Sequence, residues 1–155
     1  MLLYFSDDEP FATGAQLYSY HPITDRDLSP RLMLRVDIKG VLTSAAVDTG
    51  APYLICAPAV ARYLTLDPAM SLGRVRLLIR SVLISGWLHH LRLIFPAVRG
   101  NDLLLDATAF VPDAGYAEVW GTLPSFLGMQ GCLDRLRFAV DPVTDTFYFG
   151  PLSWE

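Results

Sequence analysis

The sequence is poor in charge, in cysteine and in long apolar runs. Charged residues make up only 18% of the 155-residue chain, hydrophobic residues make up 52%, and the formal net charge is -4. This balance offers no basic excess to a polyanion, so we expect no nucleic-acid partner. For a single domain of this size the apolar surplus indicates that some apolar surface is covered in a subunit interface.

The small number of cysteines and the short apolar runs exclude a disulfide framework and a membrane segment. Cys56 and Cys132 are too few for a disulfide framework, so we expect buried free thiols. Proline, glycine or charge interrupts every apolar stretch before the ~20 residues that a bilayer span needs, so no membrane segment is predicted. Asp7, Asp8 and Glu9 follow the apolar residues 1–5, and neither a basic segment nor a cleavage site precedes them, which argues against a secretory signal. The expected location is cytoplasmic.

Alternating apolar and polar residues indicate one mostly-β domain over 31–155. Residues 1–30 are irregular and predict an N-terminal arm that could carry short strands. A strand from Arg31 to Ile38 turns at Lys39-Gly40 into a second strand over 41–47. Further strands are expected at 72–95, as one or two hairpins interrupted at Gly86, and at 103–111, 137–140 and 147–149. Short helices are predicted over 57–66 and 129–135, and a long loop over 112–125.

The most informative segment is Asp48-Thr49-Gly50-Ala51, which lies between the apolar runs 45–47 and 52–55. Carboxylates are rarely left among apolar neighbours without a partner, so packing alone does not explain an acid here. The tripeptide Asp-Thr-Gly occurs by chance in roughly 3% of chains this long, and Asp and Gly are ordinary turn residues. Its interpretation therefore depends on what accompanies it in the chain.

Those companions lie downstream, where Phe126-Leu127-Gly128 precedes the predicted helix over 129–135 and a closing strand. In this order of elements the sequence over about 30–151 resembles the retropepsin-like aspartic proteases, the single-lobed relatives of pepsin. The resemblance implies a single-lobe acid-protease β-barrel with one or two short helices, assembled as a two-fold homodimer.

The resemblance also implies a role for each residue of two loops. Asp48 would be the catalytic carboxylate, and the Thr49 hydroxyl would bond across the subunit boundary. Gly50 would permit the close approach of the partner loop, and Ala51 is small for a related reason. The residues of the downstream loop, which would pack beneath the catalytic loop and thread beside it, are Phe126, Leu127 and Gly128.

One aspartate is insufficient for peptide hydrolysis without a metal or a nucleophile. Two carboxylates that share one proton can act as base and acid together. The sequence has no second Asp-Thr-Gly or Asp-Ser-Gly, because Asp113 is followed by Ala114 and Asp145-Thr146 runs into Phe147. The implied function is an aspartic endopeptidase, with no metal or other cofactor, that joins two copies of Asp48 in a homodimer and cleaves peptides or unfolded proteins.

The block 72–95 is where a flap over bound peptide would lie. Arg80-Ser81 and Gly86-Trp87 are both candidates for its tip, and Trp87 could equally be a core or interface residue. The block lacks the glycine-rich tip of the viral enzymes and the flap tyrosine of pepsin.

Two other functions remain open: a dimeric peptide-binding module that has kept the fold and lost catalysis, and one half of a heterodimer or larger assembly. The remaining polar residues give no rival site. His89 and His90 are adjacent and face opposite ways in a strand, so they cannot share a metal ion.

Overall fold

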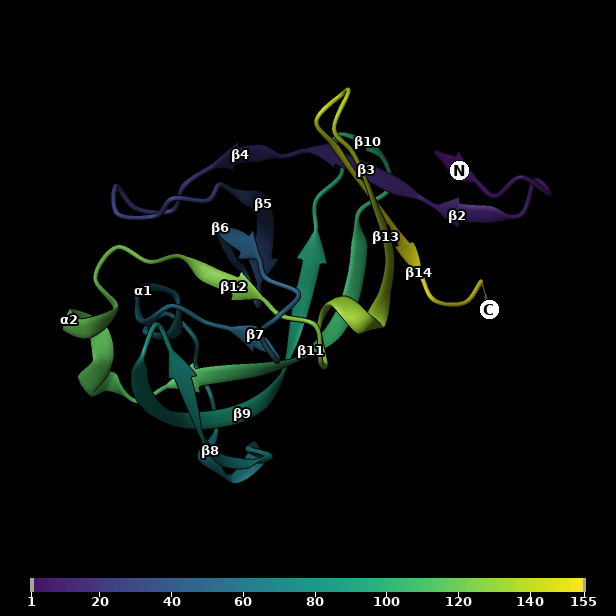
Figure 1. Cartoon of the computed structure of the whole chain (residues 1–155). Helices are drawn as coiled ribbons and strands as arrows, with labels where there is room; N and C mark the ends of the chain where they lie inside the picture. Colours follow the sequence, from purple (N-terminus) through teal and green to yellow (C-terminus); the bar gives the residue numbers. More distant parts are fainter. Residues whose placement is uncertain (1, 155) are drawn as a thin grey trace.

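The computed structural model describes residues 2–154, and β-strands dominate it (Figure 1). The strands are β1 (Leu3–Tyr4), β2 (Pro10–Ala12), β3 (Gly14–Leu17), β4 (Ser19–His21), β5 (Arg31–Ile38), β6 (Val41–Val47), β7 (Leu54–Ile55), β8 (Gly73–Ile79), β9 (Val82–Phe95), β10 (Arg99–Gly100), β11 (Leu103–Pro112), β12 (Ser125–Leu127), β13 (Leu136–Asp141) and β14 (Thr146–Pro151). The helical segments are α1 (Pro58–Ala61), α2 (Ala117–Trp120) and the 3-10 turns η1 (Pro68–Met70), η2 (Ala114–Tyr116) and η3 (Leu133–Arg135). The predicted mostly-β class is confirmed.

The larger sheet closes on itself. Its strand order is β4-β5-β6-β12-β7-β11-β9-β8, and an additional antiparallel pairing joins β5 to β9 at Asp37–Ile94 and Ile38–Leu93. Six strands, from β5 to β9 in that order, therefore form a ring. Leu34, Val36 and Ile38 point inward from β5 and are fully buried, as the alternation in this strand predicts.

A second sheet, with the order β10-β3-β14-β13, includes part of the N-terminal segment. Strand β3 lies between β10 and β14, so the residues expected to form an arm supply an inner strand. The buried Gln16 side chain joins this sheet to the barrel: its amide nitrogen donates to the carbonyl oxygens of Arg35 (3.0 Å) and Pro96 (3.2 Å). Figure 1 shows the β1–β2 hairpin and the C-terminal segment extending to the same side of the molecule.

Strands β8 and β9 form one long hairpin that turns at Arg80 and Ser81. The expected interruption at Gly86 is wrong, because β9 runs through this residue without a break. Gly86 is instead a point of close approach: a Cβ there would lie 2.8 Å from the ring of Phe110 on the neighbouring strand. Glycine lets β9 pair closely with β11 at this point.

The helices are shorter than the sequence predicted. Helix α1 ends at Ala61 although its pattern extended to residue 66, and only Val60 of its residues is buried. The predicted helix over 129–135 is reduced to η3, and the predicted loop over 112–125 contains η2 and α2. Cys56 and Cys132 are buried free thiols, as expected. Within residues 2–154 no helix has the length and apolar character needed to span a membrane.

Candidate active site

The loop after β6 is a tight turn that holds the Asp48 carboxylate in place. Strand β6 runs parallel to β12, and the Asp48 N–H donates to the carbonyl oxygen of Leu127 at 3.0 Å. Within the turn, Ala51 N–H donates to the Asp48 carbonyl oxygen (3.1 Å) and Gly50 N–H donates to Asp48 Oδ1 (3.2 Å). Backbone bonds therefore fix both the turn and the direction of the carboxylate.

The downstream loop interlocks with this turn. Gly128 N–H donates to the Tyr53 carbonyl oxygen (2.8 Å), Tyr53 N–H to that of Gln130 (2.8 Å), and Met129 N–H to that of Ala51 (2.7 Å). A Cβ on Gly128 would lie 2.6 Å from the Ala51 carbonyl oxygen, so only glycine fits here. The two loops, brought together from distant parts of the chain, form one rigid unit.

Phe126 and Leu127 belong to β12, which pairs with β6 and β7 in the barrel wall. Leu127 is fully buried in the main core, and Phe126 is 5% exposed with its ring centroid 6.1 Å from that of Trp120. Both side chains are therefore part of the packed interior next to the two loops.

Asp48 itself is partly open to solvent. Its side chain is 27% exposed, and Nη1 of Arg31 lies 3.6 Å from its Oδ1. Thr49 and Gly50 are exposed. A Cβ on Gly50 would meet only Asp48 Oδ1, at an ordinary contact distance of 3.5 Å. The packing of the subunit therefore does not itself require a glycine at position 50.

A cleft of about 360 Å³ opens beside Asp48. Its lining residues are Arg31, Asp48, Gly50, Ala51, Pro52, Ile55, Leu78, Ile79, Arg80 and Phe126. The Asp48 loop thus faces the end of the β8–β9 hairpin. Among residues 2–154, Asp48 is the only carboxylate in the lining.

The structure separates the two pairs of candidate flap residues. Arg80 and Ser81 form the turn at the end of the hairpin, beside the cleft. Gly86 and Trp87 do not lie at the tip; they lie farther along β9, opposite Val75 and Arg74. The Arg74 guanidinium lies 4.7 Å from the centroid of the Trp87 ring, so Trp87 is partly covered on the hairpin surface.

Among residues 2–154, neither His89 nor His90 belongs to a metal-binding cluster. His89 is buried and His90 exposed, as expected for neighbours in a strand, and burial lowers the pKa of His89. No group of three or more His, Cys, Asp or Glu side chains suited to a metal ion occurs between residues 2 and 154. A second cavity, of about 350 Å³ and next to α1 and α2, has Arg62 as its one charged lining residue in this range.

Two neighbours of the cleft were missed by the sequence analysis. Arg31 was read only as the first residue of a strand, although it contacts Asp48. Asp27 was placed in an irregular arm, although it binds Arg80 at the hairpin turn. An arginine in a turn that favours glycine or asparagine is a weak sequence signal of such a contact.

No protein-family model matches the sequence, and no curated protein matches it. Among solved structures, the chain is similar to the crystal structure of a retropepsin-like aspartic protease from Rickettsia conorii, with a TM-score of 0.49 and 21% sequence identity. The likeness covers 88% of this chain and 99% of that one. A likeness of this degree assigns no activity, so any function proposed for this chain has to rest on its own site residues.

Proposed function

We propose that this chain is an aspartic endopeptidase that acts as a homodimer, with one Asp48 from each subunit. The observation that carries the proposal is a single carboxylate, held by backbone bonds in a turn beside a cleft that has no second acid among the described residues. A lone carboxylate cannot supply a base and an acid at once, whereas a second copy of the same loop can.

The chemistry assigns different tasks to the two carboxyl groups. The ionised Asp48 takes a proton from a water molecule, whose oxygen attacks the carbonyl carbon of the substrate. The protonated Asp48 gives its proton to the carbonyl oxygen, which produces a tetrahedral intermediate. The carboxyl group that took the proton from water then gives it to the amide nitrogen, and the C–N bond breaks. The other carboxylate takes a proton from a hydroxyl of the collapsing intermediate, which restores the single shared proton.

The exposed part of the loop supports self-association. Thr49 and Gly50 face outward, and between residues 2 and 154 the Thr49 hydroxyl has no hydrogen-bond partner. The subunit alone gives no steric reason for glycine at position 50. Close approach of a partner loop supplies that reason, and it gives the Thr49 hydroxyl a backbone to bond.

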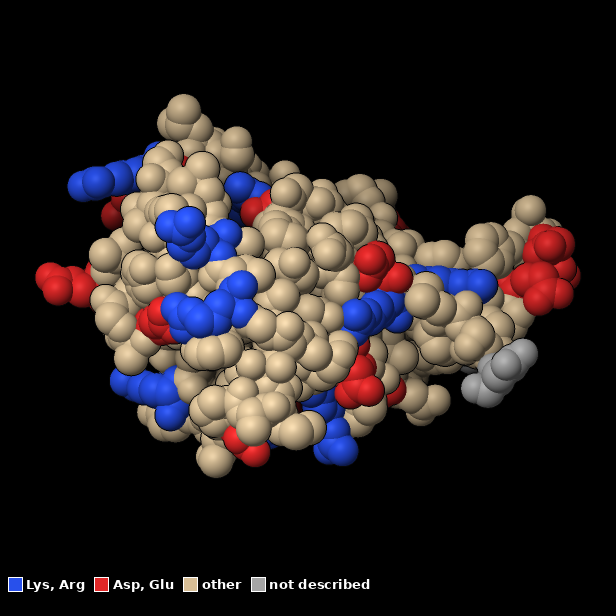
Figure 2. Space-filling model, turned by 90° about the horizontal axis from the view of Figure 1, so that it is seen from below, with Lys and Arg blue, Asp and Glu red and all other residues tan. Residues whose placement is uncertain are grey.

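The cleft suits an extended peptide. Ile55, Leu78 and Phe126 offer apolar contacts, while the neighbouring hairpin supplies backbone groups that can bond a substrate strand. On the face drawn in Figure 2, Lys and Arg are interspersed with Asp and Glu over a mostly uncharged surface. The described part of this face therefore has no continuous basic strip, which agrees with a substrate that is not a polyanion.

The test is the variant Asp48→Asn, compared with Asp145→Asn as a matched control. Asp145 lies in a turn with a φ of +50°, which asparagine tolerates, and is not among the residues that line the cleft. We expect Asp48→Asn to abolish cleavage of a diverse peptide library between about pH 3 and 8, and the control to cleave normally. Light scattering should show a dimer for both. Full activity in Asp48→Asn, or activity from a monomer, would contradict the proposal.

The peptide-binding alternative has one observation in its favour. Arg31 Nη1 lies 3.6 Å from Asp48 Oδ1, which gives the carboxylate a contact within the subunit that needs no second acid. A folded dimer that binds extended peptides and a statine-type inhibitor without cleaving any peptide would favour that function.

A further inference from the structure

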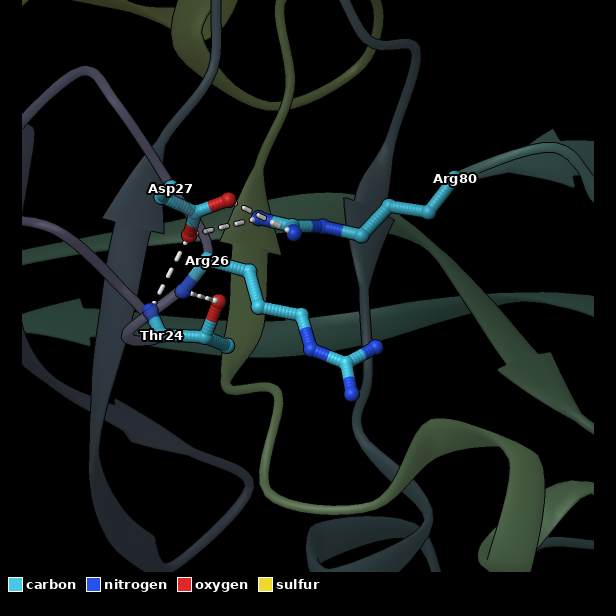
Figure 3. Close-up of polar contacts among 4 residues, drawn as sticks. All are labelled: Thr24, Arg26, Asp27 and Arg80. Atoms are coloured by element: carbon cyan, nitrogen blue, oxygen red, sulfur yellow. Dashed lines mark hydrogen bonds and ion pairs between the residues drawn. The ribbon is translucent and has the colours of Figure 1, made fainter.

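An ion pair joins the end of the β8–β9 hairpin to the loop that precedes β5. The Arg80 guanidinium donates through Nη1 to Oδ1 of Asp27 (2.9 Å) and through Nη2 to Oδ2 (3.1 Å). Figure 3 shows the Arg80 side chain extended from the hairpin toward Asp27, with Arg26 directed away from this pair. A two-point contact of this kind fixes the relative orientation of the partners as well as their separation.

The loop presents the Asp27 carboxylate in a fixed position. Asp27 Oδ2 accepts the backbone N–H of Thr24 (3.0 Å), and Asp27 N–H donates to the Thr24 carbonyl oxygen (3.1 Å). Ile23 packs against the same core cluster as Ile79 of the hairpin. The loop is therefore held beside the hairpin by contacts other than the one with Arg80.

Position 80 is a poor place for arginine on backbone grounds alone. Arg80 and Ser81 have φ values of +47° and +68°, and two-residue hairpin turns with this geometry favour Asn, Asp or Gly. The contact with Asp27 offsets that conformational cost. An arginine at this position thus has a use that the turn itself does not explain.

The same arginine lines the cleft beside Asp48, together with Leu78 and Ile79. We propose that Asp27 and Arg80 are positioning residues for the Asp48 site: their ion pair is a latch that holds the hairpin end over the cleft. This inference rests on the proposed function, in which the hairpin end covers bound peptide and excludes water. The latch acts on the substrate through the hairpin, and neither side chain takes part in bond breaking.

The chain contains a matched control on the same hairpin. Arg74 binds Asp113 through two hydrogen bonds, of 3.1 Å and 2.6 Å, and neither residue lines the cleft. The two ion pairs have comparable exposure, with side-chain values of 37% and 19% for Arg80 and Asp27 and of 45% and 35% for Arg74 and Asp113. Asp27→Asn and Asp113→Asn therefore remove the same charge from similar contacts at different distances from the site.

The experiment measures amide hydrogen exchange over residues 79–82 and peptide kinetics in the full-length variants Asp27→Asn, Arg80→Gln, their double variant and Asp113→Asn. We expect faster exchange in the first three and a KM that rises roughly two- to five-fold, the range that an exposed ion pair can supply. The kcat should change less than KM, because Asp48 is untouched. The double variant should be no worse than either single variant, because all three lose the same contact.

Unchanged exchange in Asp27→Asn, or an equal increase in Asp113→Asn, would overturn the latch. Faster exchange with an unchanged KM would also overturn it, because the pair would then stabilise the hairpin without positioning it for substrate. An unmodified chain that cleaves no peptide would instead remove the proposed function, and the exchange data would still decide whether the hairpin end is held by Asp27.

Discussion

Gly128 is confined by the backbone of the Asp48 loop, whereas Gly50, within that loop, faces open space beside the Asp48 carboxylate. A Cβ at 128 would lie 2.6 Å from the Ala51 carbonyl oxygen, but one at 50 would meet only Asp48 Oδ1 at 3.5 Å. The two glycines are therefore needed for different reasons, and substitution by alanine should separate them.

Gly128→Ala should destabilise the folded subunit by roughly 2–3 kcal/mol, because neighbouring backbone has to shift. Gly50→Ala should leave the stability of the subunit within about 0.5 kcal/mol of the parent chain while weakening the dimer and its cleavage activity. Urea unfolding at protein concentrations that keep the chain monomeric measures the stability of the subunit, and sedimentation measures the strength of the dimer. A Gly50→Ala variant with full dimerisation and activity would show that no partner loop approaches this residue.

The contact between Arg31 and Asp48 should be visible in the rate of cleavage. The Arg31 Nη1 atom lies 3.6 Å from Asp48 Oδ1, and Arg31 also lines the cleft. In Arg31→Gln the kcat/KM should fall roughly two- to five-fold, the range that a partly exposed ion pair can supply. Arg35→Gln, which replaces an exposed arginine on the same strand that does not line the cleft, is the control and should leave kcat/KM unchanged.

The sequence indicated strand 31–38 because its signal is local: the alternation follows from one buried face. Asp48-Thr49-Gly50-Ala51 is a contiguous motif, but only the resemblance joined it to Phe126-Leu127-Gly128. The prediction at Gly86 was wrong because a glycine that ends a strand and one that lets a neighbouring strand lie close are identical in sequence. The positions of the Phe110 ring and the Val111 carbonyl oxygen, both on β11, distinguish the two cases.

The contacts around the cleft could not be predicted for a related reason. Asp27 and Arg80 are 53 positions apart in the sequence, and neither residue lies in a recognisable motif. The same holds for Gln16, whose side chain joins β3 of the second sheet to the barrel. Long-range polar contacts of this kind depend on topology, which a period of two or 3.6 residues does not encode.

The titration of Asp27 offers a direct measurement of the contact with Arg80. The hydrogen bonds from the Arg80 side chain lower the pKa of Asp27 from 3.8 to about 2, and the backbone bond from Thr24 adds to the effect. Because the folded-state pKa is depressed, the contribution of this carboxylate to stability is present above pH 3.8 and is lost as the pH falls through about 2. In Arg80→Gln the NMR titration midpoint of Asp27 should return toward 3.8, whereas in Asp113→Asn it should stay near 2. A midpoint near 3.8 in the parent chain would mean that the ion pair is absent in solution.

The two cysteines should be chemically silent in the folded protein. Burial raises the pKa of both thiols from 9.0 to about 12, so almost no thiolate is present at pH 8. A thiol reagent such as dithionitrobenzoate should therefore modify neither Cys56 nor Cys132 until the chain is unfolded, when both should react. The folded-state pKa of the thiols is raised, so their contribution to the stability of the fold is complete below pH 9. It is lost as the pH rises toward 12, because the thiols of the unfolded chain ionise first. The double variant Cys56→Ser, Cys132→Ser should lack the loss of stability that thiol ionisation causes at alkaline pH. Rapid labelling of either thiol in the folded parent chain would contradict the burial on which both expectations depend.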